Sequence, residues 1–139
     1  MAFRLHLPRR LYEEMLAQAA AELPNECCGL LAGRVADGVG VVEARYPLVN
    51  AAASPREYLS DGRSMFAAVR DIDRRGLDIL AVYHSHPTSA PVPSRTDLER
   101  NSYPDAMCLI VSLQGAAPEV RAWRLTETDY REAEWECVG

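Results

Sequence analysis

The feature that most constrains the fold is a pair of short apolar runs, Ile79–Tyr83 and Met107–Val111. Short runs without polar alternation are typical of strands that are covered on both faces of a sheet. We therefore expect buried strands over residues 77–83 and 107–113, in a sheet with helices packed on its faces. Both runs are far shorter than the roughly 20 apolar residues that a membrane-spanning helix needs, so no membrane partner is expected.

The remaining elements follow from apolar spacing and from turn residues. Strands are expected over 3–7, 29–35, 39–48 and 119–125, and helices over 9–23, 62–75 and 94–101. Asp61 is expected to cap the second helix and Gly76 to end it. Helical spacing of apolar residues predicts the first helix, from Leu11, Met15, Leu16, Ala19 and Leu23. The second helix is expected to carry its apolar residues on one side, namely Met65, Phe66, Val69 and Ile72. The tail over 126–139 is compatible with a last strand or a short helix.

Composition narrows the class of protein. A chain of 139 residues, 48% hydrophobic and 25% charged, predicts a single globular domain over 1–139. The expected strands and helices are interspersed without regular β-α-β alternation, which indicates the α/β class with a mixed sheet. The net charge of −5 argues against a nucleic-acid partner. All 15 basic residues are Arg, which excludes lysine-based catalysis. No secretory signal pattern opens the chain, so a cytoplasmic location is expected, where the four cysteines would remain thiols.

The residues that could carry out chemistry lie where the strand over 77–83 meets a proline-rich stretch. His84 and His86 are two apart, so on a strand their imidazoles point the same way. Ser94 and Asp97 are three apart at the start of a helix and share one of its faces. Two imidazoles and a carboxylate are zinc ligands, and three protein ligands leave a position for water, as in catalytic zinc sites.

Each part also has a purely structural interpretation. A His-x-His pair is often only packed or exposed, and Ser94 to Asp97 is also a variant capping box. Glu26, just before the strand over 29–35, could simply face solvent. The structural and chemical interpretations are compatible for Ser94, which can cap the helix while its hydroxyl faces a metal site.

Taken together, these residues resemble the motif of the JAMM (MPN+) metalloproteases. The motif is an upstream Glu, then His-Ser-His-Pro, then a Ser separated from the second His by seven residues, then two residues and Asp. Its positions are all filled here, by Glu26, His84, His86, Ser94 and Asp97. The stretch Pro-Asn-Glu-Cys-Cys-Gly-Leu-Leu around Glu26 is also similar to the compact prokaryotic members. The resemblance covers roughly residues 1–125 and implies a single-domain, cytidine-deaminase-like mixed α/β fold.

The resemblance also implies roles and a substrate. His84, His86 and Asp97 would hold Zn²⁺, with a zinc-bound water as nucleophile. Glu26 would pass a proton from that water to the leaving amine, and Ser94 would stabilise the oxyanion. The chain lacks room for large insertions and is similar to bacterial enzymes of the CysO-cysteine type. Its expected partner is therefore a small ubiquitin-like sulfur-carrier protein with a Gly-Gly C-terminus, cleaved at the amide or isopeptide bond after that tail.

Two alternatives stay open from the sequence. A cysteine hydrolase would use Cys27 or Cys28 as its nucleophile, which requires a lowered thiol pKa. A non-catalytic MPN-type binding module would resemble family members that lost their metal ligands. This chain keeps every ligand of the motif, which argues against the binding module.

Overall fold

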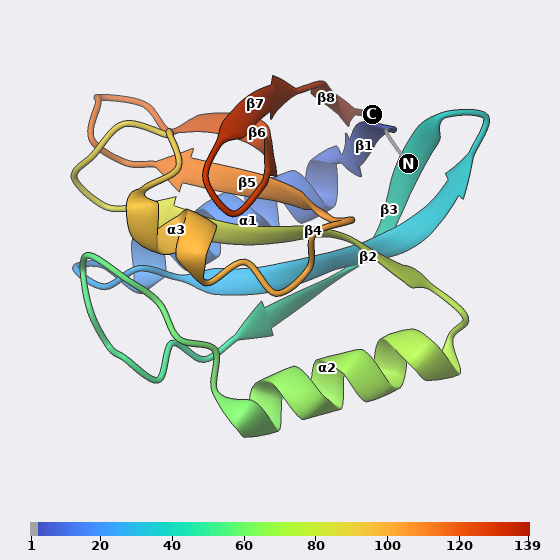
Figure 1. Cartoon of the computed structure of the whole chain (residues 1–139), viewed down its shortest axis with the longest axis horizontal. Helices are drawn as coiled ribbons and strands as arrows, with labels where there is room; N and C mark the ends of the chain where they lie inside the picture. Colours follow the sequence, from blue (N-terminus) through green and yellow to red (C-terminus); the bar gives the residue numbers. More distant parts are fainter. Residues whose placement is uncertain (1–2) are drawn as a thin grey trace.

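One mixed sheet organises the computed structural model, which describes residues 3–139. Within these residues, eight strands lie in the order β7-β6-β5-β4-β2-β3-β1-β8 (Figure 1). The strands are β1 (Arg4–Pro8), β2 (Cys28–Ala36), β3 (Val39–Leu48), β4 (Asp78–His86), β5 (Met107–Ser112), β6 (Glu119–Leu125), β7 (Tyr130–Ala133) and β8 (Trp135–Val138). Strand β1 runs parallel to β3 and β8, and β4 runs parallel to β5, while the other neighbours are antiparallel. The expected mixed α/β class is confirmed.

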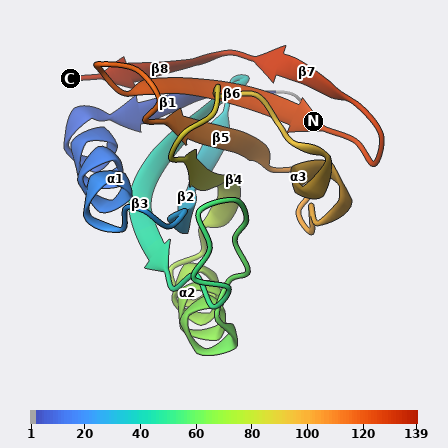
Figure 2. The same cartoon turned by 90° about the vertical axis from the view of Figure 1, so that its left-hand side faces the viewer.

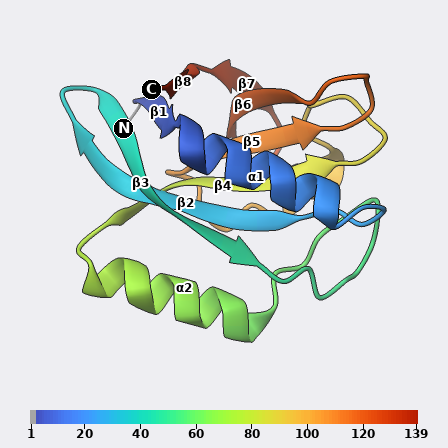
Figure 3. The ribbon, with the colours of Figure 1, turned by 180° about the vertical axis from the view of Figure 1, so that it is seen from behind.

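Helices cover both faces of this sheet, as the apolar runs predict. The long helices α1 (Arg9–Ala21) and α2 (Gly62–Arg74) lie on opposite sides (Figures 2 and 3), and the short α3 (Arg95–Glu99) lies near the ends of β4 and β5. Strand β2 shows the two-sided burial directly. Leu31 packs in the apolar cluster of α1, and Leu30 packs in that of α2. The first six residues of β2 are all buried, so this part of the strand shows no polar alternation.

The first helix is shorter than its apolar spacing predicts. Helix α1 ends at Ala21 rather than residue 23, and Leu23 lies beyond it with 47% of its surface exposed. Pro24 disfavours helical geometry at the residue before it. The chain turns there instead, with the Asn25 N–H donating to the carbonyl of Glu22 over 2.9 Å. Leu23 is therefore not part of the core, contrary to the prediction.

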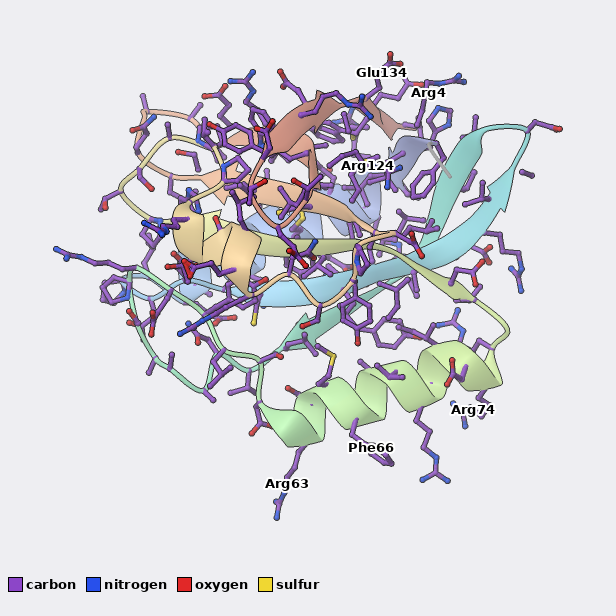
Figure 4. The ribbon with its side chains drawn as sticks, viewed as in Figure 1. Arg4, Arg63, Phe66, Arg74, Arg124 and Glu134 are labelled. Atoms are coloured by element: carbon purple, nitrogen blue, oxygen red, sulfur yellow. The ribbon has the colours of Figure 1, made fainter. Side chains whose placement is uncertain are left out.

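The second helix faces the sheet with a narrower stripe than predicted. Ala68 and Ile72 are buried, whereas Phe66 is 68% exposed and points away from the sheet (Figure 4). A residue next to a buried position lies about 100° around the helix, which carries Phe66 off the stripe that Met65 and Ile72 share. The capping prediction is confirmed, since the side chain of Asp61 accepts from the Ser64 N–H.

The C-terminal tail forms β7 and β8, the two edge strands of the sheet, and so brings its two edges together. Strand β7 pairs with β6 and β8 pairs with β1, and only Glu134 separates β7 from β8 in the chain. The carbonyl of Glu134 accepts from the Leu5 N–H over 3.1 Å. The sheet is therefore strongly curled. No helix within residues 3–139 is long and apolar enough to cross a membrane.

Candidate metal centre

The two histidines of the His-x-His pattern lie at the carboxyl end of β4. The strand continues through His86 instead of breaking after Tyr83, because its last residues stay paired with β5 up to the pair His86 and Ser112. Strand alternation then points both imidazoles to one face. Their Nε2 atoms lie 3.1 Å apart, and both rings are buried.

Asp97 approaches the two imidazoles from helix α3. Its Oδ1 lies 3.1 Å from Nε2 of His84, and its Oδ2 lies 3.3 Å from Nε2 of His86. A capping box fixes the carboxylate, since Oδ2 accepts from the Ser94 N–H over 2.8 Å and Ser94 Oγ accepts from the Asp97 N–H over 3.1 Å. The helix cap therefore presents the carboxylate to the histidines, so the structural and ligand interpretations hold together.

The two imidazoles and the carboxylate are close enough together to share one zinc ion. The Nε2 atoms lie 3.1 Å apart, and each faces a different oxygen of Asp97, over 3.1 Å for His84 and 3.3 Å for His86. These separations are near the edge of about 3.3 Å of a tetrahedron with bonds of about 2.0–2.1 Å to zinc, and one ligand atom from each residue lies within 4.8 Å of the others. Nδ1 of His86 lies 2.8 Å from the Ala90 carbonyl, which only accepts, so Nδ1 carries a proton and Nε2 is the nitrogen that can offer a lone pair once a cation replaces its proton. The arrangement of His84, His86 and Asp97 fits a divalent cation.

Electrostatics in the cluster already favour a positive charge facing Asp97. Burial would raise the pKa of this carboxyl, but the charge of His84 and hydrogen bonds from both imidazoles and the Ser94 N–H hold it well below its usual range. Burial lowers the pKa of His86, yet the hydrogen bonds to Asp97 and Ala90 outweigh burial and raise it. A metal ion must displace the proton that an imidazole such as His86 shares with Asp97. The affinity for a cation therefore falls as the pH falls.

Glu26 is buried beside this cluster rather than exposed to solvent. It is 3% exposed, and its Oε1 has no hydrogen-bond partner within residues 3–139. Burial raises the pKa of Glu26 to about 8, partly offset by the charge of His86, while Asp97 and Glu57 raise it further. An unpartnered buried carboxyl is unusual in a structural role, and a nearby cation would favour its charged form.

Ser94 caps α3 and keeps a donor available. Its Oγ accepts from the Asp97 N–H, which leaves the hydroxyl hydrogen free to donate elsewhere. The residue is exposed, so a substrate oxygen can approach this hydroxyl from solvent.

Three further residues shape the site and carry no motif in the sequence. Tyr58 stacks on His84 with ring centroids 4.8 Å apart, and the Ala90 carbonyl orients His86. Asn50, 8% exposed, donates from Nδ2 to the carbonyl of Glu26 over 3.0 Å. Tyr58 and Asn50 act across long sequence separations, and Ala90 acts through a main-chain carbonyl that any residue type would offer, so the sequence contains no signal for these contacts.

Both candidate thiol nucleophiles are sealed inside the protein. Cys27 and Cys28 have no exposed surface. Burial raises the pKa of Cys27 to about 11 and that of Cys28 to about 12. A thiol that stays protonated and out of reach is a poor nucleophile, so the geometry opposes the cysteine-hydrolase alternative.

An apolar cavity of about 70 Å³ adjoins His84 and Asp97 on the side of α2. Its lining includes Leu48, Met65 and Met107. Apolar surroundings lower the local dielectric, which strengthens the electrostatic interactions of the cluster.

The chain matches one protein family, several named relatives and a solved structure. Residues 8–126 match the family described as prokaryotic homologs of the JAB domain. The chain is 40% identical over 115 residues to a desampylase of Haloferax volcanii, covering 82% of this chain and 79% of that protein. It is 32% identical over 118 residues to a CysO-cysteine peptidase of Mycobacterium tuberculosis, covering 84% and 80% of the two chains. A solution structure of a Desulfitobacterium hafniense protein matches with a TM-score of 0.86 and 35% identity, covering 96% and 92%.

Proposed function

Because the chain belongs to the family of prokaryotic JAB-domain homologues, we propose that it is a zinc-dependent peptidase acting on conjugates of a ubiquitin-like carrier. The bond cleaved is the amide after the Gly-Gly tail of a small sulfur-carrier protein. The observation that carries the proposal is the convergence of His84, His86 and Asp97 on one point, with the buried carboxyl of Glu26 alongside.

The residues divide the work of amide hydrolysis. His84, His86 and Asp97 would hold a zinc ion, which when bound would lower the pKa of a water molecule and polarise the scissile carbonyl. Glu26 takes the proton that the attacking water loses and returns it to the leaving amine, for which its unpartnered Oε1 is suited. The Ser94 hydroxyl donates to the carbonyl oxygen as negative charge develops, a contribution of about 3 kcal/mol for a well-placed donor.

The names of the relatives support the substrate class. One of them is named a CysO-cysteine peptidase and another a desampylase. Both names describe proteins of nearly the same span as this chain, since the alignments cover about four fifths of each. We infer that this chain also releases a small leaving group or a protein from a carrier ending in Gly-Gly.

The test uses a carrier with cysteine joined by an amide bond to its Gly-Gly end. Zinc-loaded protein is incubated with this adduct, and intact mass spectrometry follows the release of free carrier and cysteine. Glu26→Gln should retain zinc and lose turnover by about a hundredfold or more, because general acid–base catalysis contributes about 10²–10⁴-fold. Absence of release with an intact metal site would contradict the proposal.

Two reagents separate the metal reaction from thiol chemistry. A chelator should abolish release, and added zinc should restore it. Iodoacetamide should leave the rate unchanged, because Cys27 and Cys28 are buried and protonated. Inhibition by iodoacetamide together with resistance to chelation would favour the cysteine hydrolase instead.

A further inference from the structure

The carboxyl of Glu26 is placed by its main chain rather than by its own hydrogen bonds. Its Oε1 is buried without a partner within residues 3–139. By contrast, both main-chain polar groups of Glu26 are hydrogen-bonded. The N–H donates to the carbonyl of Ser54 over 2.8 Å, and the carbonyl accepts from Nδ2 of Asn50 over 3.0 Å. Where this acid stands therefore depends on the segment over 50–60.

Asn50 is the centre of that segment. Its Nδ2 donates to the carbonyls of Glu26 and Glu57, over 3.0 and 3.1 Å. Its Oδ1 accepts from the N–H groups of Ala52 and Leu59, both over 3.0 Å. The side chain thus uses two donors and two acceptor positions, which is the full hydrogen-bonding capacity of an amide. A buried amide satisfied in this way specifies one loop conformation, because any other leaves polar groups unpaired.

The same segment contacts the metal centre from a second direction. Asn50 and Ser60 form an isolated bridge that closes the base of the loop, and the Ala51 N–H donates to the carbonyl of Leu59. Between these ends, Tyr58 stacks on His84. A loop held by one side chain therefore connects Glu26 with a metal-ligating imidazole.

We propose that Asn50 is a positioning residue that sets where the Glu26 carboxyl stands relative to the metal centre. It does so by hydrogen-bonding the main chain of Glu26 and by fixing the loop whose Ser54 carbonyl holds the other side of that residue. The inference rests on the proposed function, in which Glu26 moves the proton. Asn50 itself touches neither substrate nor metal.

The central variant is Asn50→Asp, which keeps the shape and the acceptor but replaces the two donors with an oxygen facing two carbonyls. We expect kcat to fall by about a hundredfold, the size of loss that a shift of about 1 Å in a catalytic group produces. KM and zinc content should stay near those of the unaltered protein. Asn50→Ala removes the four hydrogen bonds without adding a charge, and keeps the test open if the aspartate variant does not fold. The control is Arg56→Ala, an exposed residue of the same loop that should leave kcat unchanged.

Two measurements distinguish positioning from a merely structural role. In a Glu26→Gln background, Asn50→Asp or Asn50→Ala should cause no further loss of the residual rate, because the residue acts through Glu26. Independently of activity, amide hydrogen exchange followed by NMR should be faster at Glu26 in the Asn50 variants than in the Arg56→Ala control.

The outcomes separate this inference from the proposed function. If the unaltered protein releases carrier and the Asn50 variants are equally fast, or lose their zinc, the positioning role is overturned while the peptidase proposal stands. If the unaltered protein releases no carrier, the peptidase proposal fails, and the exchange rate at Glu26 still decides whether Asn50 holds its main chain. Unchanged exchange at Glu26 in a folded variant overturns the inference.

Discussion

At the scale of single residues, Asp97 has two roles at once, as a helix cap and as a candidate metal ligand. Its carboxylate accepts from the Ser94 N–H at the start of α3 and faces the Nε2 atoms of His84 and His86. Asp97→Asn keeps an oxygen for the cap but loses the charge that a cation requires. We expect zinc affinity to fall by more than about a hundredfold, because losing even an outer partner of a metal ligand costs about 10- to 100-fold.

Competition with a chromophoric chelator measures this loss of zinc affinity. Thr96→Ala, in the same turn of α3, is the matched control and should bind zinc as tightly as the unaltered protein. An Asp97→Asn variant with unchanged affinity would remove Asp97 from the set of metal ligands.

Glu26 gives the metal-free protein a characteristic dependence on pH. Its pKa is about 8 in the folded protein against 4.5 for an unperturbed Glu, so the folded state holds this proton more tightly. The contribution of Glu26 to stability is therefore full below about pH 4.5 and is lost as the pH rises towards 8. Glu26→Gln has no proton to lose.

We therefore expect the free energy of unfolding of the metal-free protein to fall relative to Glu26→Gln by on the order of 3 kcal/mol between pH 5 and pH 7. Urea unfolding of the chelator-treated proteins at both pH values measures the difference. Added zinc should reduce it, because a cation favours the charged carboxylate. Equal pH dependence of the two metal-free proteins would show that burial does not hold Glu26 protonated.

At the scale of elements, α2 is anchored by a narrow stripe of side chains. Ile72 is 2% exposed and Phe66 is 68% exposed on the same helix. Ile72→Ala should lower the free energy of unfolding by about 2–4 kcal/mol, since it opens a cavity in the core. Phe66→Ala should change it by less than about 0.5 kcal/mol. Urea unfolding of the two variants checks the pair, and equal losses would contradict the orientation of α2.

Elements with local signals are the ones the sequence predicts well. Asp37 and Gly38 adopt positive φ in the turn between β2 and β3, as an Asp-Gly hairpin requires. The apolar runs locate β4 and β5, because a strand that is buried on both faces is apolar at consecutive residues. Phe66 and Leu23 are predicted wrongly because being apolar does not decide which residue meets the sheet.

In the site, too, the sequence predicts contacts within one element but not contacts between distant segments. His84 and His86 share a strand, and Ser94 and Asp97 share a helix turn, so their mutual geometry is local and spacing reveals it. Asn50 acts on Glu26 from 24 residues away through a main-chain carbonyl, and any residue type would offer that carbonyl. No pattern in one sequence encodes such a contact.

At the scale of the whole molecule, the order of the strands and the curling of the sheet depend on pairings between distant segments. Strand β8 pairs with β1 across the length of the chain, and Trp135 stacks on Tyr12 of α1 with centroids 5.8 Å apart. We call this contact of β8 with β1 and α1 the seam; it lies away from α3 (Figure 1). The two open possibilities for the tail could not be decided from its composition, because its last strand, β8, pairs with β1, the first strand in the sequence.

Trp135→Ala should therefore weaken the fold without touching the metal centre. We expect the free energy of unfolding to fall by about 2 kcal/mol, less than for a fully buried aromatic residue because Trp135 is half-buried. Zinc affinity, measured by chelator competition on the folded variant, should stay within about twofold because the sites are distant. A parallel loss of zinc affinity would mean that the seam and the metal centre are coupled.

The central claim is that two imidazoles and one carboxylate hold a catalytic zinc ion, and anomalous X-ray diffraction at the zinc edge tests it most directly. Crystals of the zinc-loaded protein should show one strong anomalous peak about 2.0–2.1 Å from Nε2 of His84, Nε2 of His86 and a carboxylate oxygen of Asp97. A well-ordered site without that peak, or zinc bound by other residues instead, would contradict the account.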